Sequence, residues 1–133
     1  RNETVIPRRS VQAAREGRAA GPDDHSRFAS YLMLEFGRMD ARRGWTKQLH
    51  LGPLRNACSR GLRLLGPDTG FDSIGDYPQA EALAGYLDRL DQEGSLPRMI
   101  LYNNNPTQNY VFATMAGNFQ DGITPGKIQF GAG

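Results

Sequence analysis

His50 is the residue in this chain whose type and position best suit chemistry. It ends a short segment with strand character, 45–50, and the loop after it carries Arg55. A neutral imidazole at a strand end can ligate a metal ion or move a proton, and a nearby guanidinium can bind a carboxylate through two hydrogen bonds. A hydrogen-bonded structural histidine and an ion-paired surface arginine are the alternatives, and residue type alone favours them.

Other polar side chains near these two could assist them or could be purely structural. Asp68, Asp72 and Asp76 could act as acids or bases, or could orient the imidazole and the guanidinium, although aspartates in such a loop more often form turns and caps. The three asparagines at 103–105 could hold a ligand, but they too are more typical of a helix cap. Cys58 shows no sign of thiolate activation.

No short catalytic motif in this chain identifies a reaction. Gly131 and Gly133 after a strand-like segment form only the first half of a dinucleotide-binding fingerprint. The chain contains no phosphate-binding P-loop, no nucleophile elbow and no HExxH metal motif. Its single cysteine also excludes an intrachain disulfide framework and a cysteine-based zinc cluster.

Helical and strand patterns alternate along the chain. The clearest helix lies between Asp76, a good N-cap with Gln79 three residues on as in a capping box, and Gly94, which can stop it. Residues 1–23 show no sustained period and are expected to form a loop or an insertion, so the domain is expected to span 24–133. The other expected elements are helix 24–43, strand 45–50, loop 51–75, strand 98–102, helix 105–117 and strand 127–130.

This alternation predicts an α/β fold. Strands separated by helices are typically parallel and joined by right-handed crossovers, so three strands and three helices make a slice of a parallel sheet or barrel. Ligands in such folds meet the carboxyl ends of the strands. That rule places His50, the asparagines at 103–105 and the segment 131–133 together at one rim, the edge of the sheet where the strands end.

The charge of the chain is uneven. Of 133 residues, 16 are Lys or Arg and 14 are Asp or Glu; residues 1–63 carry 13 basic and 6 acidic side chains, whereas residues 64–133 carry 3 and 8. A basic half can bind nucleic acid or an acidic partner. Because it lacks the interleaved aromatic residues of a stacking platform, complementary charge within one fold is the preferred interpretation.

Length and composition suit a single domain in the cytoplasm. No apolar segment approaches the roughly 20 residues that a membrane span needs. Low cysteine usage suits a reducing compartment. The chain opens on Arg1 and stops directly after a strand-like segment, so it is expected to be a piece of a longer protein.

Six segments, in order, closely resemble bacterial uronate isomerases, also called glucuronate isomerases. The resemblance runs through roughly residues 28–133. The segments are ARRGW (41–45), QLHLGPLRN (48–56), LLGPDTGFDSI (64–74), ILY (100–102), GNFQ (117–120) and PGKIQFG (125–131).

The resemblance implies a fold and a reaction. The fold is an amidohydrolase-like (β/α)8 TIM barrel, with the strands ending at His50, Tyr102 and Phe130 as the fifth to seventh of eight. The reaction interconverts D-glucuronate with D-fructuronate, and D-galacturonate with D-tagaturonate, by proton transfer between C2 and C1. The resemblance also implies a divalent metal ion, with zinc as the expected ion. The expected partner is a uronate sugar, and the full-length protein is expected to be a homo-oligomer that binds neither nucleic acid nor a membrane.

The resemblance also assigns roles to individual residues. His50 matches a catalytic, metal-ligand or substrate-contact histidine, and Arg55 matches an arginine expected to bind the substrate carboxylate. Asn56 and Asp72 are further substrate-binding candidates, although the family's asparagine run is broken here by Ala57. The His-x-His pair and the Asp and Arg of the family lie outside these residues, so the piece alone is expected to be inactive. The alternative is a non-enzymatic module whose basic half binds nucleic acid or an acidic partner.

Overall fold

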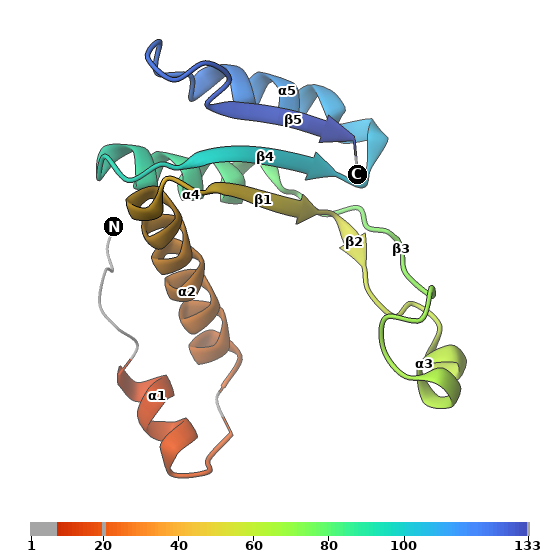
Figure 1. The fold of residues 1–133 in the computed structure, drawn as a ribbon. Coiled ribbons are helices and arrows are strands. Elements are labelled where there is room, and N and C mark those ends of the chain that lie inside the picture. The colour runs from red at the N-terminus through yellow and green to blue at the C-terminus, as the bar shows by residue number, and fades with distance from the viewer. Residues whose placement is uncertain (1–7, 20, 133) are drawn as a thin grey trace.

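The computed structural model describes residues 8–19 and 21–132, and its centre is a parallel three-stranded sheet (Figure 1). The prediction of an α/β fold with three parallel strands is confirmed, and each strand lies within two residues of its expected limits. In sheet order the strands are β1 (Thr46–Leu51), β4 (Arg98–Asn103) and β5 (Ile128–Ala132).

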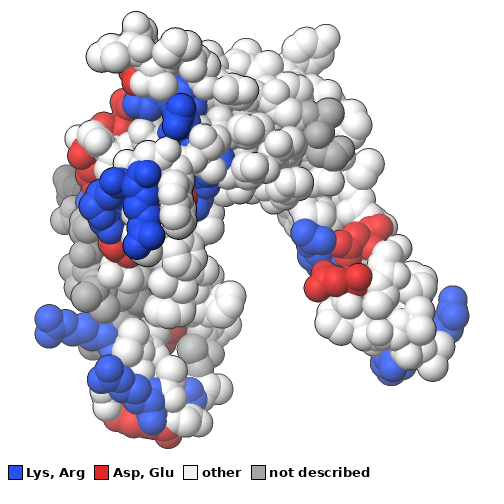
Figure 2. Space-filling view, viewed as in Figure 1, with Lys and Arg blue, Asp and Glu red and all other residues white. Residues whose placement is uncertain are grey.

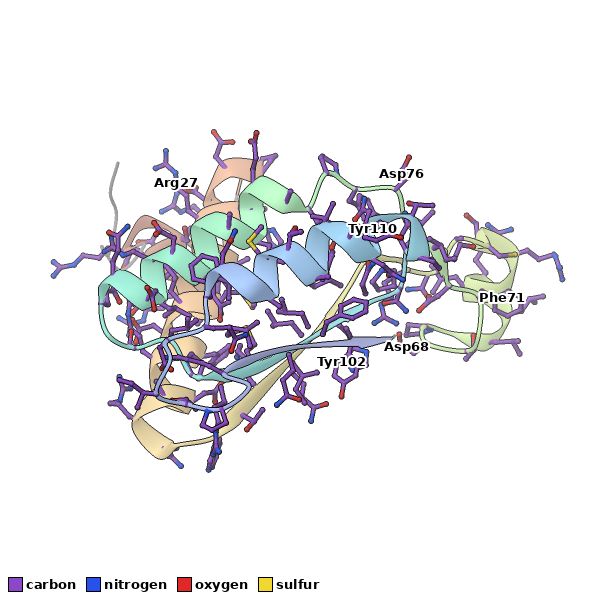
Figure 3. All side chains as sticks on the ribbon, turned by 90° about the horizontal axis from the view of Figure 1, so that it is seen from above. Arg27, Asp68, Phe71, Asp76, Tyr102 and Tyr110 are labelled. Atoms are coloured by element: carbon purple, nitrogen blue, oxygen red, sulfur yellow. The ribbon has the colours of Figure 1, made fainter. Side chains whose placement is uncertain are left out.

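Helices join the neighbouring strands of this sheet. α4 (Ala80–Gln92) leads into β4, and α5 (Asn109–Asn118), which follows the 3-10 helix η1 (Pro106–Gln108), leads into β5. Both helices lie on the same face of the sheet (Figures 1 and 3). The long helix α2 (Pro22–Arg43) precedes β1.

The hydrophobic core lies between that face and the two helices. Because successive strand residues point to opposite faces, one set of side chains meets the helices and the other set lies on the open face. Figure 3 shows Tyr102 on the side of the sheet away from α4 and α5. The fully buried side chains of the core are Leu87, Leu90, Met99, Leu101 and Phe112.

α2 and α4 pack closely at Gly37. A Cβ built on Gly37 would lie 2.6 Å from Cδ1 of Leu90 and 2.9 Å from the hydroxyl oxygen of Tyr86, so this approach requires glycine. Beside it Arg38 makes two hydrogen bonds to the carboxylate of Glu93, at 2.7 and 2.8 Å. These contacts join the basic and acidic halves of the chain.

Residues 1–23, expected to form a loop or an insertion, contain a helix, so the loop interpretation was wrong for residues 8–15. α1 (Arg8–Arg15) packs on α2, burying Ser10 and Ala13, and the Ser10 hydroxyl donates to the backbone carbonyl of Asp24 at 3.3 Å. Eight residues are too few for their own periodicity to predict a helix that depends on tertiary packing. Residues 1–7 lie outside the described part of the chain.

The expected loop 51–75 also has regular structure, which corrects that prediction. β2 (Pro53–Leu54) and β3 (Ser73–Ile74) pair antiparallel and carry α3 (Ser59–Leu65) between them. We call residues 52–75 the arm. Figure 1 shows the arm extending from the end of the sheet to which the strand arrows point.

The first turn of α4 also differs from expectation. The helix begins at Ala80 rather than just after Asp76, and the side chain of Gln79 makes no cap hydrogen bond. Instead the Gln79 amide donates to Gln108 at 2.8 Å, and Gln108 donates to the carbonyl of Tyr77 at 2.8 Å. These tertiary hydrogen bonds hold the residues before α4 against η1.

Charges of both signs are mixed on the surface. Figure 2 shows acidic side chains beside basic ones, both over the helices and on the arm. No helix in the part of the chain described here is long and apolar enough to cross a membrane.

Candidate functional site

The carboxyl ends of β1, β4 and β5 place His50, Tyr102 and Gly131 in one row across the sheet. His50 pairs with Tyr102, and Tyr102 pairs with Gly131, in parallel register. The rings of His50 and Tyr102 are stacked, with centroids 4.5 Å apart and planes inclined by 25°. The predicted rim of strand ends therefore exists, and His50 lies on the open face of the sheet.

A cavity of about 350 Å³ connects this rim to the arm. It is lined by three of the four predicted site residues, together with residues of the β2–β3 pair and the loop after β4. The lining residues are His50, Pro53, Arg55, Asp72, Ser73, Ile74 and Asn104.

Arg55 is held by Asp72 at the edge of this cavity. Nη1 of Arg55 donates to Oδ2 of Asp72 at 2.5 Å, while 58% of the arginine side chain remains exposed. The guanidinium carries five N–H donors in a fixed fork, so one bond to Asp72 leaves others available. Asp72 thus orients Arg55 and leaves other N–H donors of the guanidinium available to bind a second carboxylate.

Asp72 has both of its oxygens engaged within the arm. Oδ1 accepts from the backbone N–H of Asn56 at 2.8 Å, and Oδ2 accepts from Arg55. The hydrogen bond from Asn56, followed by that from Arg55, holds the pKa of the Asp72 carboxyl below its ordinary value. Asp72 is therefore a carboxylate at neutral pH that fixes the turn carrying Arg55.

Asn56 is directed toward the turn rather than into the cavity. Its φ of 52° is left-handed, a region that asparagine tolerates, and its Oδ1 accepts from the backbone N–H of Asp68 at 3.3 Å. Cys58 also has a local partner, since its sulfur accepts from the N–H of Gly61 at 3.4 Å at the start of α3.

Sequence reasoning missed the contact that Tyr102 makes at the site. Tyr102 was placed on a strand, but its stack on His50 depends on the register between strands, which sequence does not give. Asn104 belongs to the asparagine run that had been placed at the rim. Its Oδ1 is buried and has no hydrogen-bond partner within the described residues.

The neighbouring asparagines have structural roles. Asn103 donates to the carbonyl of Asn105 at 2.6 Å and to the side chain of Asn109 at 3.0 Å. Asn105 caps η1 by accepting from the N–H of Thr107 at 3.1 Å and donates to the carbonyl of Gly75 at 3.1 Å. The helix-cap interpretation is therefore correct for Asn105, which also links the arm to the sheet.

These residues do not form a complete metal site. Within the described ranges there is no group of three His, Cys, Asp or Glu side chains that could hold a metal ion. His50 offers one imidazole, and Asp72, the nearest carboxylate of the cavity, is already bonded to Arg55 and Asn56. A single histidine does not fix a metal ion in a preferred geometry.

Comparison with known proteins identifies the family of this chain. The glucuronate isomerase family model matches residues 3–133, which extends the resemblance into the segment before residue 28. A uronate isomerase of Opitutus terrae is 67% identical over 121 residues, covering 91% of this chain and 26% of the relative. A uronate isomerase of Solibacter usitatus is 63% identical over 120 residues, covering 90% and 26%.

A solved structure agrees with the sequence relatives. The crystal structure of uronate isomerase from Thermotoga maritima matches with a TM-score of 0.81 at 30% identity, over 96% of this chain and 26% of that one. The chain thus spans about a quarter of the length of the relatives it matches, and the interpretation as a partial barrel is confirmed. The alternative of a non-enzymatic binding module finds no support. The chain belongs to the glucuronate isomerase, or uronate isomerase, family.

Proposed function

We propose that this chain supplies one wall of the substrate site of a uronate isomerase. The substrate is a sugar acid, with D-glucuronate and D-fructuronate, or D-galacturonate and D-tagaturonate, as the interconverted pairs. The observation that carries the proposal is the shared cavity of His50 and Arg55 at the carboxyl end of a parallel strand, in a chain of this family. The activity belongs to the whole enzyme, and residues 1–133 alone are expected to be inactive.

Arg55 binds the carboxylate of the sugar acid. A guanidinium matches a carboxylate with two parallel N–H···O bonds, which fix the direction of the sugar chain as well as its position. Asp72 holds Arg55 at the cavity edge through Nη1. The remaining donors of the fork are available for the substrate carboxylate. Asn56 supports this arrangement through its backbone N–H, which binds Asp72.

His50 acts at the other end of the substrate. Conversion of an aldose to a ketose moves a proton between C2 and C1 through an enediolate, so the site needs a group that transfers protons and donors near the developing oxyanion. An imidazole suits either task at neutral pH. Its exposure on the open face of the sheet leaves it accessible to a sugar lying in the cavity.

The family is metal-dependent in general, and we propose zinc as the ion for the whole enzyme. The residues described in the structure do not form a complete metal site on their own. We further propose a homo-oligomeric, cytoplasmic enzyme that acts on a small-molecule uronate without nucleic acid or membrane.

The test is turnover of D-glucuronate by the full-length protein that contains this chain. Formation of the ketose is measured for the unsubstituted enzyme and for Arg55→Lys, which keeps the charge and removes the planar fork. We expect turnover in the former and a KM raised about 10-fold or more in the latter. Absence of ketose formation from any uronate would reject the proposed function.

A further inference from the structure

The imidazole of His50 has an aromatic neighbour, the ring of Tyr102. No side-chain hydrogen bond to its imidazole is present within residues 8–19 and 21–132, and the ring stacks on Tyr102 at 4.5 Å between centroids. An exposed imidazole without a hydrogen-bonded partner can rotate about its side-chain bonds. The stacked ring opposes that rotation, because turning the imidazole out of the observed plane gives up the stacking contact.

Gly131 provides the space that Tyr102 occupies. A Cβ built on Gly131 would lie 2.7 Å from Cε1 and 2.8 Å from Cδ1 of the Tyr102 ring. The φ of Gly131 is not in the left-handed region, so the glycine is needed for space and not for backbone conformation. The tyrosine ring thus leans across β5, with its other neighbour on β1.

We propose that Tyr102 is a positioning residue for His50, and that Gly131 makes this position available to it. This inference rests on the proposed function and goes further by assigning a role to two residues that are not among those lining the cavity. The imidazole is held in one plane relative to the cavity that also contains Arg55. Tyr102 acts through its ring face, so its hydroxyl group is dispensable.

The test uses the full-length enzyme and three substitutions with different expected outcomes. Tyr102→Phe keeps the ring and is expected to keep kcat within about 2-fold. Tyr102→Leu removes the ring, and Gly131→Ala places a methyl group where the ring lies. Both are expected to lower kcat by about 10- to 100-fold with little change in KM, because His50 is misplaced while Arg55 still binds the carboxylate.

A matched control and a second readout separate positioning from general damage. Gly117→Ala adds the same methyl group on α5, where no atom of the described residues lies within 4 Å of the new Cβ, and should leave kcat and KM unchanged. NMR of the His50 ring protons should show a downfield change in Tyr102→Leu, because the ring current of the stacked tyrosine is lost, and none in Tyr102→Phe. If Tyr102→Leu cannot be obtained folded, Gly131→Ala carries the test with the tyrosine intact.

The contrary results are distinct. A kcat unchanged in Tyr102→Leu or Gly131→Ala overturns the inference, and so does an equal loss in Tyr102→Phe, which would assign the effect to the hydroxyl group. In each of these cases uronate turnover by the unsubstituted enzyme would leave the proposed function standing. Absence of that turnover would instead remove the proposed function, and this inference with it.

Discussion

Arg55 and Asp72 lie 17 residues apart in the chain, yet Nη1 of one and Oδ2 of the other are 2.5 Å apart. The pair closes the arm at its base, since Arg55 follows β2 and Asp72 precedes β3. The same carboxylate binds the N–H of Asn56 at 2.8 Å. The position of the guanidinium at the cavity edge is therefore set by the arm and not by strand β1.

Asp72→Asn should weaken substrate binding more than catalysis. The amide keeps the shape of the side chain but loses the charge that holds Arg55, so we expect KM for D-glucuronate to rise about 3- to 10-fold with kcat changed less. Steady-state kinetics of the full-length enzyme measure both. Asp68→Asn is the control, because Asp68 lies in the same arm with a left-handed φ of 58° that asparagine accepts. Equal effects of the two substitutions would contradict the role given to Asp72.

The same pair makes a pH-dependent contribution to stability. The pKa of Asp72 is lowered from 3.8 in the folded state, so its contribution is present above pH 3.8 and is lost as the pH falls through the lowered folded-state pKa. The enzyme should be more stable to heat than Asp72→Asn at neutral pH, with a difference that shrinks in acid. Thermal unfolding of both proteins across this range measures it, and a difference independent of pH would be the contrary result.

The close contact of α2 with α4 predicts opposite effects for two glycines. Gly37→Ala puts a Cβ 2.6 Å from Leu90 and should destabilise the protein by about 1–3 kcal/mol through overpacking. Gly85→Ala on α4 meets no atom within 4 Å in the part of the chain that the structure describes, and should stabilise the protein by about 0.5–1 kcal/mol, since alanine favours the helix. Denaturant unfolding compares them, and equal signs would show that α2 and α4 do not pack this way.

Two adjacent asparagines should also respond differently. Asn105→Ala removes the cap of η1 and the bond to the Gly75 carbonyl, and should cost about 1–3 kcal/mol. Asn104→Leu removes a buried carbonyl oxygen that lacks a partner in the described structure, and should be neutral or stabilising. The free energies of unfolding of the two variants decide this, and a large loss in Asn104→Leu would show that its oxygen is satisfied in the whole enzyme.

The sequence predicted the parts of the fold that depend on local chemistry. The strand limits were predicted to within two residues, and α2 ends at the predicted residue, followed by Gly44, whose φ of 66° is typical of a helix stop. His50 was placed at the rim from the rule for parallel strands and Arg55 in the loop that follows it, and the structure puts both in one cavity.

The remaining features depend on contacts between distant segments. The capping-box pattern at Asp76 and Gln79 was locally valid, but Gln79 bonds to Gln108 instead. The arm contains regular structure because two contacts join its strands and its helix. The backbone N–H of Ala57 donates to the carbonyl of Phe71, and the ring of Phe71 covers Gly61 of α3. Tyr102 could be assigned to a strand, but its stack on His50 follows from strand register. None of these pairings leaves a signal in local periodicity.

The most direct test of the central claim is whether Arg55 recognises the carboxylate of the sugar. The kcat/KM of the full-length enzyme for D-glucuronate is divided by that for the neutral carboxamide analogue, and the ratio is measured again in Arg55→Ala. The account predicts a preference for the carboxylate of about 10-fold or more in the unsubstituted enzyme, which disappears in the variant. The same ratio in both proteins would show that the carboxylate is bound elsewhere and would contradict the site proposed here.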